Sequence, residues 1–193
     1  MDAAGFGRAH IVGNSLGGYL ALLLAARGRA ESVVALAPAG GWAVGDGSAR
    51  EMLLRFRDMQ VQLRAAAPTA DRIVATAAGR RAAVQYIVTQ AEHIPGELIA
   101  HIMLGIVRCD ALEPLLQFAL RGSWEVDAAQ VACPVRIVWG TADKVLPWPS
   151  AAERFRSEWL PNADWIELDG VGHCPQLDVP VEAAQLILGS TNR

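Results

Sequence analysis

The chain has 193 residues, of which 52% are hydrophobic and 19% charged, with a formal net charge of -3 at pH 7. This length predicts one globular unit with a substantial core, and this composition excludes an intrinsically disordered chain. The slightly acidic balance, without a run of lysine or arginine, predicts no nucleic-acid partner.

Strands and helices are predicted to alternate near both ends of the chain. Short β-rich runs, the first three almost wholly apolar as in buried parallel strands, predict strands at 9–12, 32–36, 135–139 and 164–168. Helical patterns occur at 16–26, 150–159 and 181–188. This alternation predicts an α/β fold, a mostly parallel sheet with flanking helices and right-handed crossovers.

The middle of the chain has a different pattern, because no convincing strand occurs between Trp42 and Asp127. Helices are expected there at 48–66, 69–89, 95–107 and 111–120. An all-helical block inserted between two strands is most simply a cap over the carboxyl ends of the strands, where ligands bind in such sheets. We therefore expect an α/β core of residues 1–41 and 128–193, with residues 42–127 as an inserted helical cap.

The first predicted strand runs into Gly13-Asn14-Ser15-Leu16-Gly17-Gly18, directly before a predicted helix. A serine on such a strand-to-helix turn presents its Oγ at a helix N-terminus, which makes Ser15 a candidate nucleophile. Gly13 and Gly17 are expected because a Cβ at either position would clash where strand and helix approach each other. The alternatives are an ordinary glycine-rich turn or a phosphate-binding loop, whose Gly-x-Gly-x-x-Gly spacing this segment does not fit.

An activated serine needs a base within hydrogen-bond reach and an acid that orients the base. His173 follows the strand predicted at 164–168, and Asp143 follows the strand predicted at 135–139. The carboxyl ends of parallel strands share one sheet edge, so Ser15, Asp143 and His173 are expected to meet there. Asp169 and Asp178 are the alternative acids, and capping of a turn is the alternative role for each aspartate.

These features together resemble the α/β-hydrolase superfamily in its cap-bearing branch. The resemblance covers essentially the whole chain and rests on the Ser15 turn, the Gly140-Thr141-Ala142-Asp143 loop, the Gly172-His173 loop and the helical block between them. The order Ser15, Asp143, His173 is the order of that family and favours Asp143 as the acid.

The resemblance implies a serine hydrolase that acts on a small ester-like or other acyl substrate through an acyl-enzyme. Hydrolysis of a carbon-carbon bond and cofactor-free haloperoxidase-like activity are the alternative chemistries. No cofactor and no metal are implied. A serine nucleophile argues against the haloalkane dehalogenase and epoxide hydrolase branches, which use aspartate at this position.

The chain also departs from the family pattern. Complete members have further strands before this turn and a loop that supplies one of two oxyanion N-H donors. The N-H of Leu16 can supply one donor, and we expect no source for the other, since only twelve residues precede Gly13. The first strand is then expected at a sheet edge. The alternative function is therefore an impaired fragment, or a subunit whose sheet is completed by a missing N-terminal part, a partner chain or a second copy.

Three residues near the predicted strand ends are candidates for a substrate pocket: Asn14, Trp42 and Trp148. Plain core or lid packing is the alternative for each of them. Cys174, beside the candidate base, is expected to be a small buried hydrophobe.

Cysteine usage and hydropathy predict the compartment. The chain has an odd number of cysteines at unrelated spacings, Cys109, Cys133 and Cys174, which favours neither a disulfide framework nor a zinc site. The longest apolar run, 19–26, is far shorter than the roughly 20 residues that span a bilayer, and no leader pattern is seen. We therefore expect a cytoplasmic chain with no membrane partner.

Overall fold

A computed structural model describes residues 1–43, 47–121 and 124–191, apart from the side chains of residues 48, 49 and 121. The chain divides into two compact units. The sheet unit comprises Met1–Ala43, Tyr86–Val88 and Glu125–Arg193, and the helical unit comprises Val44–Gln85 and Thr89–Trp124.

The sheet unit contains four parallel strands in the order β1-β2-β3-β4. They are β1 (Ala9–Asn14), β2 (Ala30–Leu36), β3 (Val135–Gly140) and β4 (Asp164–Leu168). The expected fold class is confirmed, and all four strands lie where the apolar runs predicted them. β1 continues two residues further than predicted, because Gly13 and Asn14 still pair with Ala35 and Leu36 of β2.

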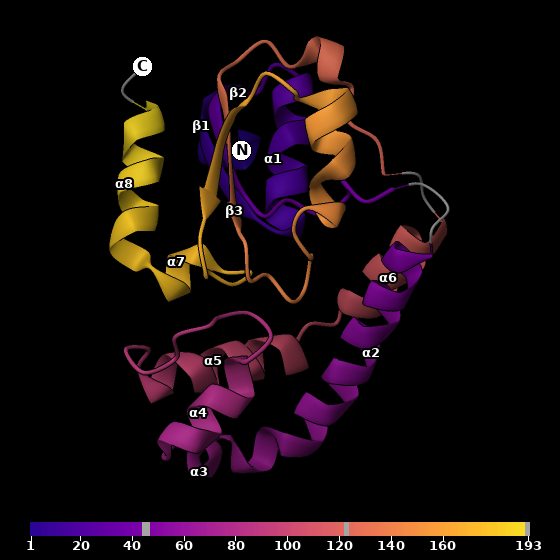
Figure 1. Ribbon diagram of the computed structural model, residues 1–193. Coiled ribbons are helices and arrows are strands. Elements are labelled where there is room, and N and C mark those ends of the chain that lie inside the picture. The colour runs from indigo at the N-terminus through magenta and orange to yellow at the C-terminus, as the bar shows by residue number, and fades with distance from the viewer. Residues whose placement is uncertain (44–46, 122–123, 192–193) are drawn as a thin grey trace. The chain divides into compact units, whose positions relative to one another are not determined.

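Helices cover both faces of this sheet (Figure 1). The helix α1 (Leu16–Ala26) and the segment 150–159 lie on one face, and α8 (Pro180–Thr191) lies on the other. The short helices of the unit are η1 (Asp2–Ala4), η3 (Ala128–Gln130), η4 (Ser150–Ala152), η5 (Phe155–Trp159) and α7 (Pro175–Asp178). The single helix expected at 150–159 is interrupted, because the Arg154 N-H donates to the carbonyl of Gly41 at 2.8 Å and leaves the helical ladder.

The central strands of the sheet are buried, whereas β1 forms an exposed edge. Val34, Leu36 and Val138 are at most 2% exposed and belong to a cluster that packs against Leu186 and Ile187 of α8. Full burial of such a side chain contributes roughly 1.5–3 kcal/mol to the free energy of unfolding. Val12 of β1 is 43% exposed, and β1 has β2 as its sole strand neighbour among the described residues. The expected edge position of β1 is thus confirmed.

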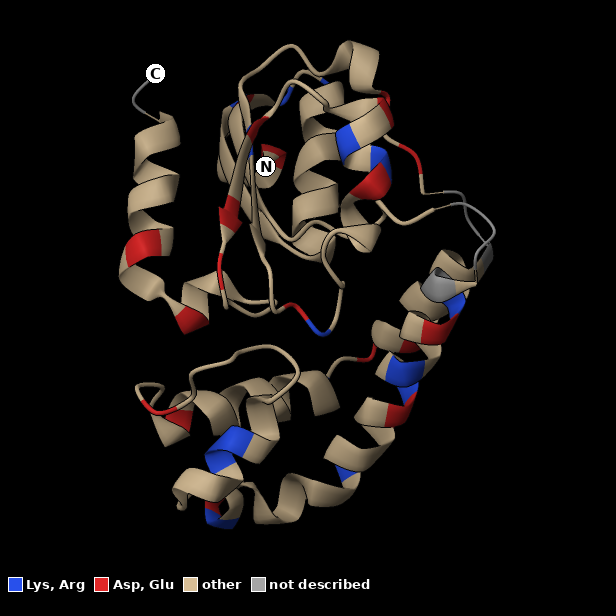
Figure 2. Ribbon diagram, in the orientation of Figure 1, with Lys and Arg blue, Asp and Glu red and all other residues tan. Residues whose placement is uncertain are grey.

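The helical unit contains only helices and turns in its described residues. They are α2 (Ser48–Ala66), η2 (Ala67–Thr69), α3 (Ala70–Val74), α4 (Ala77–Val84), α5 (Gly96–Val107) and α6 (Leu112–Arg121). Acidic and basic residues follow each other along α2, as on an exposed helix face (Figure 2). None of the helices in the described part of the chain has both the length and the apolar character needed to cross a bilayer.

Two helices, α3 and α4, occupy the stretch in which a single helix was expected at 69–89. Thr76 begins a new helix there, because its Oγ1 accepts the N-H of Gly79 at 3.0 Å and caps α4. A Cβ at Gly79 would lie 1.8 Å from the carbonyl oxygen of Ile73, so the two helices meet at a tight turn. The segment after α4, Tyr86–Val88, belongs to the sheet unit. The proposed role of the helical unit as a cap stays a prediction.

Candidate active site

Ser15 lies on a strained turn between β1 and α1. Its backbone has φ 56° and ψ -121°, a conformation that costs a residue other than glycine about 1–3 kcal/mol. The Ser15 N-H is held by the carbonyl of Leu36 at 2.9 Å. Within the described part of the chain the Ser15 hydroxyl makes no hydrogen bond, so it is free to act on a ligand.

The glycines around Ser15 allow the strand and helix to approach closely, though not at both of the predicted positions. A Cβ at Gly13 would lie 2.1 Å from the carbonyl oxygen of Gly17, and a Cβ at Gly18 would lie 3.0 Å from Pro38. A Cβ at Gly17 would meet no atom within 4 Å outside its own helix, so the clash that we expected there is wrong. The second close approach falls one residue later, at Gly18, because a Cβ on Gly17 would point into open space, although the Gly17 carbonyl itself faces Gly13.

Leu16 is the first residue of α1. The N-H groups of a first helical turn have no acceptor within their own helix, and the helix dipole places partial positive charge there. The Leu16 N-H is therefore suited to donate a hydrogen bond to an oxygen that gains negative charge beside Ser15.

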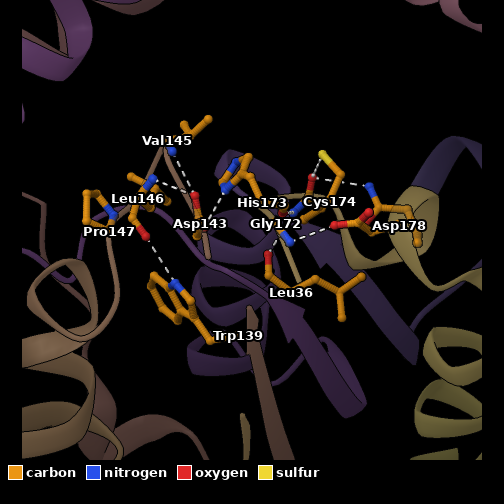
Figure 3. Close-up of polar contacts among 12 residues, drawn as sticks. Leu36, Trp139, Asp143, Val145, Leu146, Pro147, Gly172, His173, Cys174 and Asp178 are labelled. Carbon is orange, nitrogen blue, oxygen red and sulfur yellow. Dashed lines mark hydrogen bonds and ion pairs between the residues drawn. The ribbon is translucent and has the colours of Figure 1, made fainter. Parts of the chain in front are cut away.

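Asp143 and His173 form a buried pair (Figure 3). The Asp143 Oδ2 and the His173 Nδ1 are 2.8 Å apart, and their side chains are 0% and 5% exposed. The other oxygen of Asp143 accepts the backbone N-H groups of Val145 and Leu146, each at 2.8 Å. The indole N-H of Trp139 donates to the Leu146 carbonyl at 3.1 Å and closes the same loop. Both oxygens of the Asp143 carboxylate are thus hydrogen-bonded. Because Asp143 contacts the Nδ1 of His173, the Nε2 is the ring nitrogen that can exchange a proton with a substrate or a nucleophile.

Two glycines bring the aspartate and histidine loops together. A Cβ at Gly140 would lie 2.2 Å from the carbonyl oxygen of Val171, so only glycine fits at the end of β3. A Cβ at Gly172 would lie 3.0 Å from the carbonyl oxygen of Ile87. That same carbonyl accepts the N-H of Cys174 at 2.8 Å. Sequence reasoning missed Ile87, because its contribution is a backbone carbonyl and leaves no signal in the side chain.

The two alternative acids occupy other places. The carboxylate of Asp178, a buried residue, accepts the Gly172 N-H at 2.7 Å and braces the histidine loop from α7. Asp169 accepts the hydroxyl of Thr141 at 3.1 Å in an exposed pair. Of the three aspartates, Asp143 is the one that contacts the imidazole.

The residues expected to line a pocket are placed as follows. The side chain of Asn14 donates to the carbonyls of Leu36 and His173, each at 3.0 Å. Trp148 lies between other tryptophans, with ring centroids 5.9 Å from Trp139 and 6.2 Å from Trp165. Trp42 is also buried. Contacts within the sheet unit thus account for Asn14 and Trp148, and the pocket role of all three stays a prediction.

Cys174 is a buried thiol beside the histidine. Burial, and then the nearby Asp143 carboxylate, raise the pKa of this thiol to about 12. Its Sγ donates to the Oδ1 of Asn14 at 3.4 Å. Among the described residues, no group of three or more histidine, cysteine or acidic side chains is arranged to hold a metal ion.

The structure therefore joins two of the three candidate catalytic residues directly. Asp143 and His173 share a hydrogen bond, and Asn14, the residue before Ser15, donates to the backbone carbonyl of His173. In the residues described, the hydroxyl of Ser15 is not bonded to the imidazole. Catalytic hydrogen bonds often tighten only when substrate is bound, so this geometry is compatible with a nucleophile and its base.

Known proteins resemble the chain over nearly its whole length. A family model described as "Alpha/beta hydrolase family" matches residues 2–186. The epoxide hydrolase EphH of Mycobacterium tuberculosis is 32% identical over 188 residues, which cover 97% of this chain and 87% of that protein.

Solved structures share the fold at lower identity. The 2-hydroxy-6-oxo-6-phenylhexa-2,4-dienoate hydrolase of Rhodococcus sp. strain RHA1 matches 100% of the chain with a TM-score of 0.65 and 18% identity. The carboxylesterase CesB of Bacillus subtilis matches 98% with a TM-score of 0.64 and 20% identity. The chain spans 67% of the length of the first structure and 62% of the second.

Proposed function

The chain belongs to the α/β-hydrolase family, and from this premise we propose that it is a serine hydrolase of small acyl substrates. Ser15 is the nucleophile, His173 the general base, and Asp143 the residue that orients the base. The observation that carries this proposal is the buried Asp143-His173 pair at 2.8 Å, in which the backbone carbonyl of His173 also accepts the side-chain amide of Asn14, the residue before Ser15.

The proposed reaction proceeds in two stages. The Ser15 Oγ attacks the substrate carbonyl while its proton passes to the Nε2 of His173, and Asp143 stabilises the imidazolium that forms. The oxyanion accepts the N-H of Leu16, and the imidazolium then protonates the leaving group. Water activated by His173 hydrolyses the acyl-enzyme and restores the Ser15 hydroxyl.

The oxyanion site decides how fast this reaction can be. Leu16 supplies one N-H donor, and oxyanion sites of this kind use two. Loss of one donor typically lowers kcat by about 10²- to 10³-fold. The alternative function is an impaired subunit or fragment without a second donor, which would form the acyl-enzyme slowly.

A second chemistry is suggested by the relative named as an epoxide hydrolase. Attack of a carboxylate on an epoxide carbon forms an ester, which water can hydrolyse at the carbonyl. Attack of the Ser15 Oγ would instead form an ether, which has no carbonyl for water to attack and would leave the enzyme alkylated before any diol is released. Turnover of epoxides by this chain would thus require His173 to activate water directly.

Three reagents distinguish serine hydrolysis of an ester from hydrolysis of an epoxide: a fluorophosphonate probe, p-nitrophenyl acetate and styrene oxide. We expect the probe to label Ser15 and the ester to be hydrolysed, with both lost in Ser15→Ala. Asp143→Asn is expected to lower kcat by about 10⁴-fold, because the imidazole loses its orienting acceptor. Circular dichroism confirms that each variant is folded.

Two results would contradict the serine mechanism. The first is a folded wild-type chain whose Ser15 remains unlabelled at long incubation. The second is hydrolysis of p-nitrophenyl acetate that continues unchanged in Ser15→Ala. Diol formation from styrene oxide that survives this substitution would indicate direct attack by water on the epoxide. Carbon-carbon bond hydrolysis and perhydrolysis remain the alternative serine chemistries, and the same variants test them with other substrates.

A further inference from the structure

Asn14 uses both ends of its side-chain amide. Its Nδ2 donates to two carbonyls, those of Leu36 and His173, at 3.0 Å each. Its Oδ1 accepts from the Sγ of Cys174 at 3.4 Å and from the Nε2 of Gln176 at 3.2 Å. Two carbonyl oxygens face the nitrogen and two donors face the oxygen, so the amide fits in one orientation only.

These bonds connect the backbone of the nucleophile to the backbone of the base. The carbonyl of Leu36 accepts the N-H of Ser15 at 2.9 Å and also the amide of Asn14. The second hydrogen of that amide goes to the carbonyl of His173. A continuous network, Ser15 to Leu36 to Asn14 to His173, therefore spans β1, β2 and the loop after β4.

The other contacts of the histidine loop hold it without reference to Ser15. Asp143 fixes the imidazole, Asp178 fixes the N-H of Gly172, and Ile87 fixes the N-H of Cys174. These contacts arise from the loop after β3, from α7 and from the segment 86–88, and none of these segments carries the proposed nucleophile. Asn14 is the residue of β1 that reaches the loop.

We propose that Asn14 is a positioning residue that sets the distance between the Ser15 hydroxyl and the His173 imidazole. This inference rests on the proposed serine mechanism. The strained backbone at Ser15 makes such a tie necessary, because φ 56° persists only where surrounding contacts enforce it. Aspartate would fit in the same volume but would turn a carboxylate oxygen toward two carbonyls.

The chemistry of neighbouring groups supports the same role. The Oε1 of Gln176 is buried and has no partner among the described residues, so the amide of Gln176 is held through its Nε2 on Asn14. Loss of Asn14 would leave the His173 carbonyl and the Nε2 of Gln176 without these partners at once, while the Leu36 carbonyl would keep the N-H of Ser15. The histidine loop would then be free to move relative to the serine turn.

The test compares Asn14→Ala with Thr141→Val in the full chain. Thr141 is a matched control, because its hydroxyl also makes two hydrogen bonds to this loop, to Asp169 at 3.1 Å and to the N-H of Gly170 at 2.9 Å, and neither reaches β1. Fluorophosphonate labelling of Ser15 is measured as a second-order rate constant against pH, well below the Tm of each variant. Amide hydrogen exchange is measured for Gly172 and Cys174.

We expect Asn14→Ala to lower the labelling rate constant by about 10²-fold, the scale of a misplacement near 1 Å. The midpoint of its pH profile should stay at the wild-type value, because the Asp143-His173 pair is intact. Exchange at Gly172 and Cys174 should accelerate. Thr141→Val should lower Tm yet label close to the wild-type rate.

The inference is overturned if Asn14→Ala labels at the wild-type rate, or if Thr141→Val slows labelling as much. If the wild-type chain is folded but unlabelled, the serine mechanism fails, and exchange alone then decides the role of Asn14. Unchanged exchange at Gly172 and Cys174 in Asn14→Ala would refute the tie, whereas faster exchange in that variant alone would support it.

Discussion

At the scale of one residue, Cys174 shows how the fold keeps a nucleophilic group protonated and unreactive beside His173, the proposed general base. The thiolate is the reactive form of cysteine, and a thiol with a pKa of about 12 stays protonated throughout the range in which a serine hydrolase works. Its Sγ also donates to Asn14, so it has a structural use. Cys174, the residue after the proposed base, is thereby prevented from competing with Ser15, the proposed nucleophile.

This burial predicts the pH dependence of two measurements. At about pH 8.5, the ordinary pKa of a free cysteine, iodoacetamide should alkylate Cys109 in the folded chain and spare Cys174 until urea is added. The pKa of Cys174 is higher in the folded than in the unfolded chain. The thiol therefore lowers the free energy of unfolding as pH rises from about 8.5 toward 12 and has no such effect below that window.

Urea titrations of the wild type and Cys174→Ala over this pH range test whether the thiol lowers the free energy of unfolding as pH rises. The wild-type curve should fall more steeply with pH than the curve of the variant. Parallel curves, or rapid alkylation of Cys174 in the native chain, would show that the thiol ionises in the folded state.

At the scale of elements, the packing of β1 against α1 depends on one glycine of the serine turn. Gly13→Ala would place a Cβ 2.1 Å from the carbonyl oxygen of Gly17, which is backbone and cannot rotate away. Gly17→Ala adds the same methyl group where no atom lies within 4 Å outside the helix. The two variants thus differ chiefly in this clash, and also in that Gly13 lies in β1 whereas Gly17 lies in α1.

We expect Gly13→Ala to lower the free energy of unfolding by several kcal/mol or to prevent folding, as large effects follow from strain of this kind. Gly17→Ala should be neutral or raise it by up to about 1 kcal/mol, because alanine favours a helix over glycine. Urea denaturation measures both. Equal destabilisation by the two substitutions would contradict the close approach at Gly13.

Much of the fold at this scale follows from the sequence, because buried parallel strands require unbroken apolar runs and such runs are visible. The break at Thr76 is not visible, because the residues on either side keep a helical pattern and the turn depends on contact between Gly79 and Ile73. The Asp143-His173 pair could be predicted because both residues follow strands of one parallel sheet. The tie made by Asn14 could not, since its partners are carbonyls of Leu36 and His173 from distant segments.

At the scale of the whole molecule, the division of the chain does not follow the boundaries of its helical block. The segment Tyr86–Val88 belongs to the sheet unit although it lies between α4 and α5. Val88 is 4% exposed there, and the carbonyl of Ile87 holds the histidine loop. Helical periodicity in the sequence does not indicate that this segment contacts the histidine loop, because the segment contributes backbone groups and one small apolar side chain.

The open edge of the sheet leads to the last prediction. β1 contains no charged residue and no proline, and these are the usual devices that stop one edge strand from pairing with another. Val12 is 43% exposed on this strand, so the edge combines unpaired backbone groups with apolar surface. We therefore expect the 193-residue chain to associate through β1, with a second copy or with a strand-donating partner.

Val12→Lys and Val181→Lys test this expectation as a matched pair. Both replace an exposed valine with lysine, but Val181, 71% exposed, lies on α8 and not on a strand. The mass of the wild type by light scattering should rise with concentration, Val12→Lys should remain near the mass of one chain, and Val181→Lys should behave as the wild type does. A wild-type chain that stays monomeric and melts cooperatively at every concentration would show that β1 needs no partner strand. The edge would then be protected by its own twist and short length, the other means by which a six-residue strand avoids pairing.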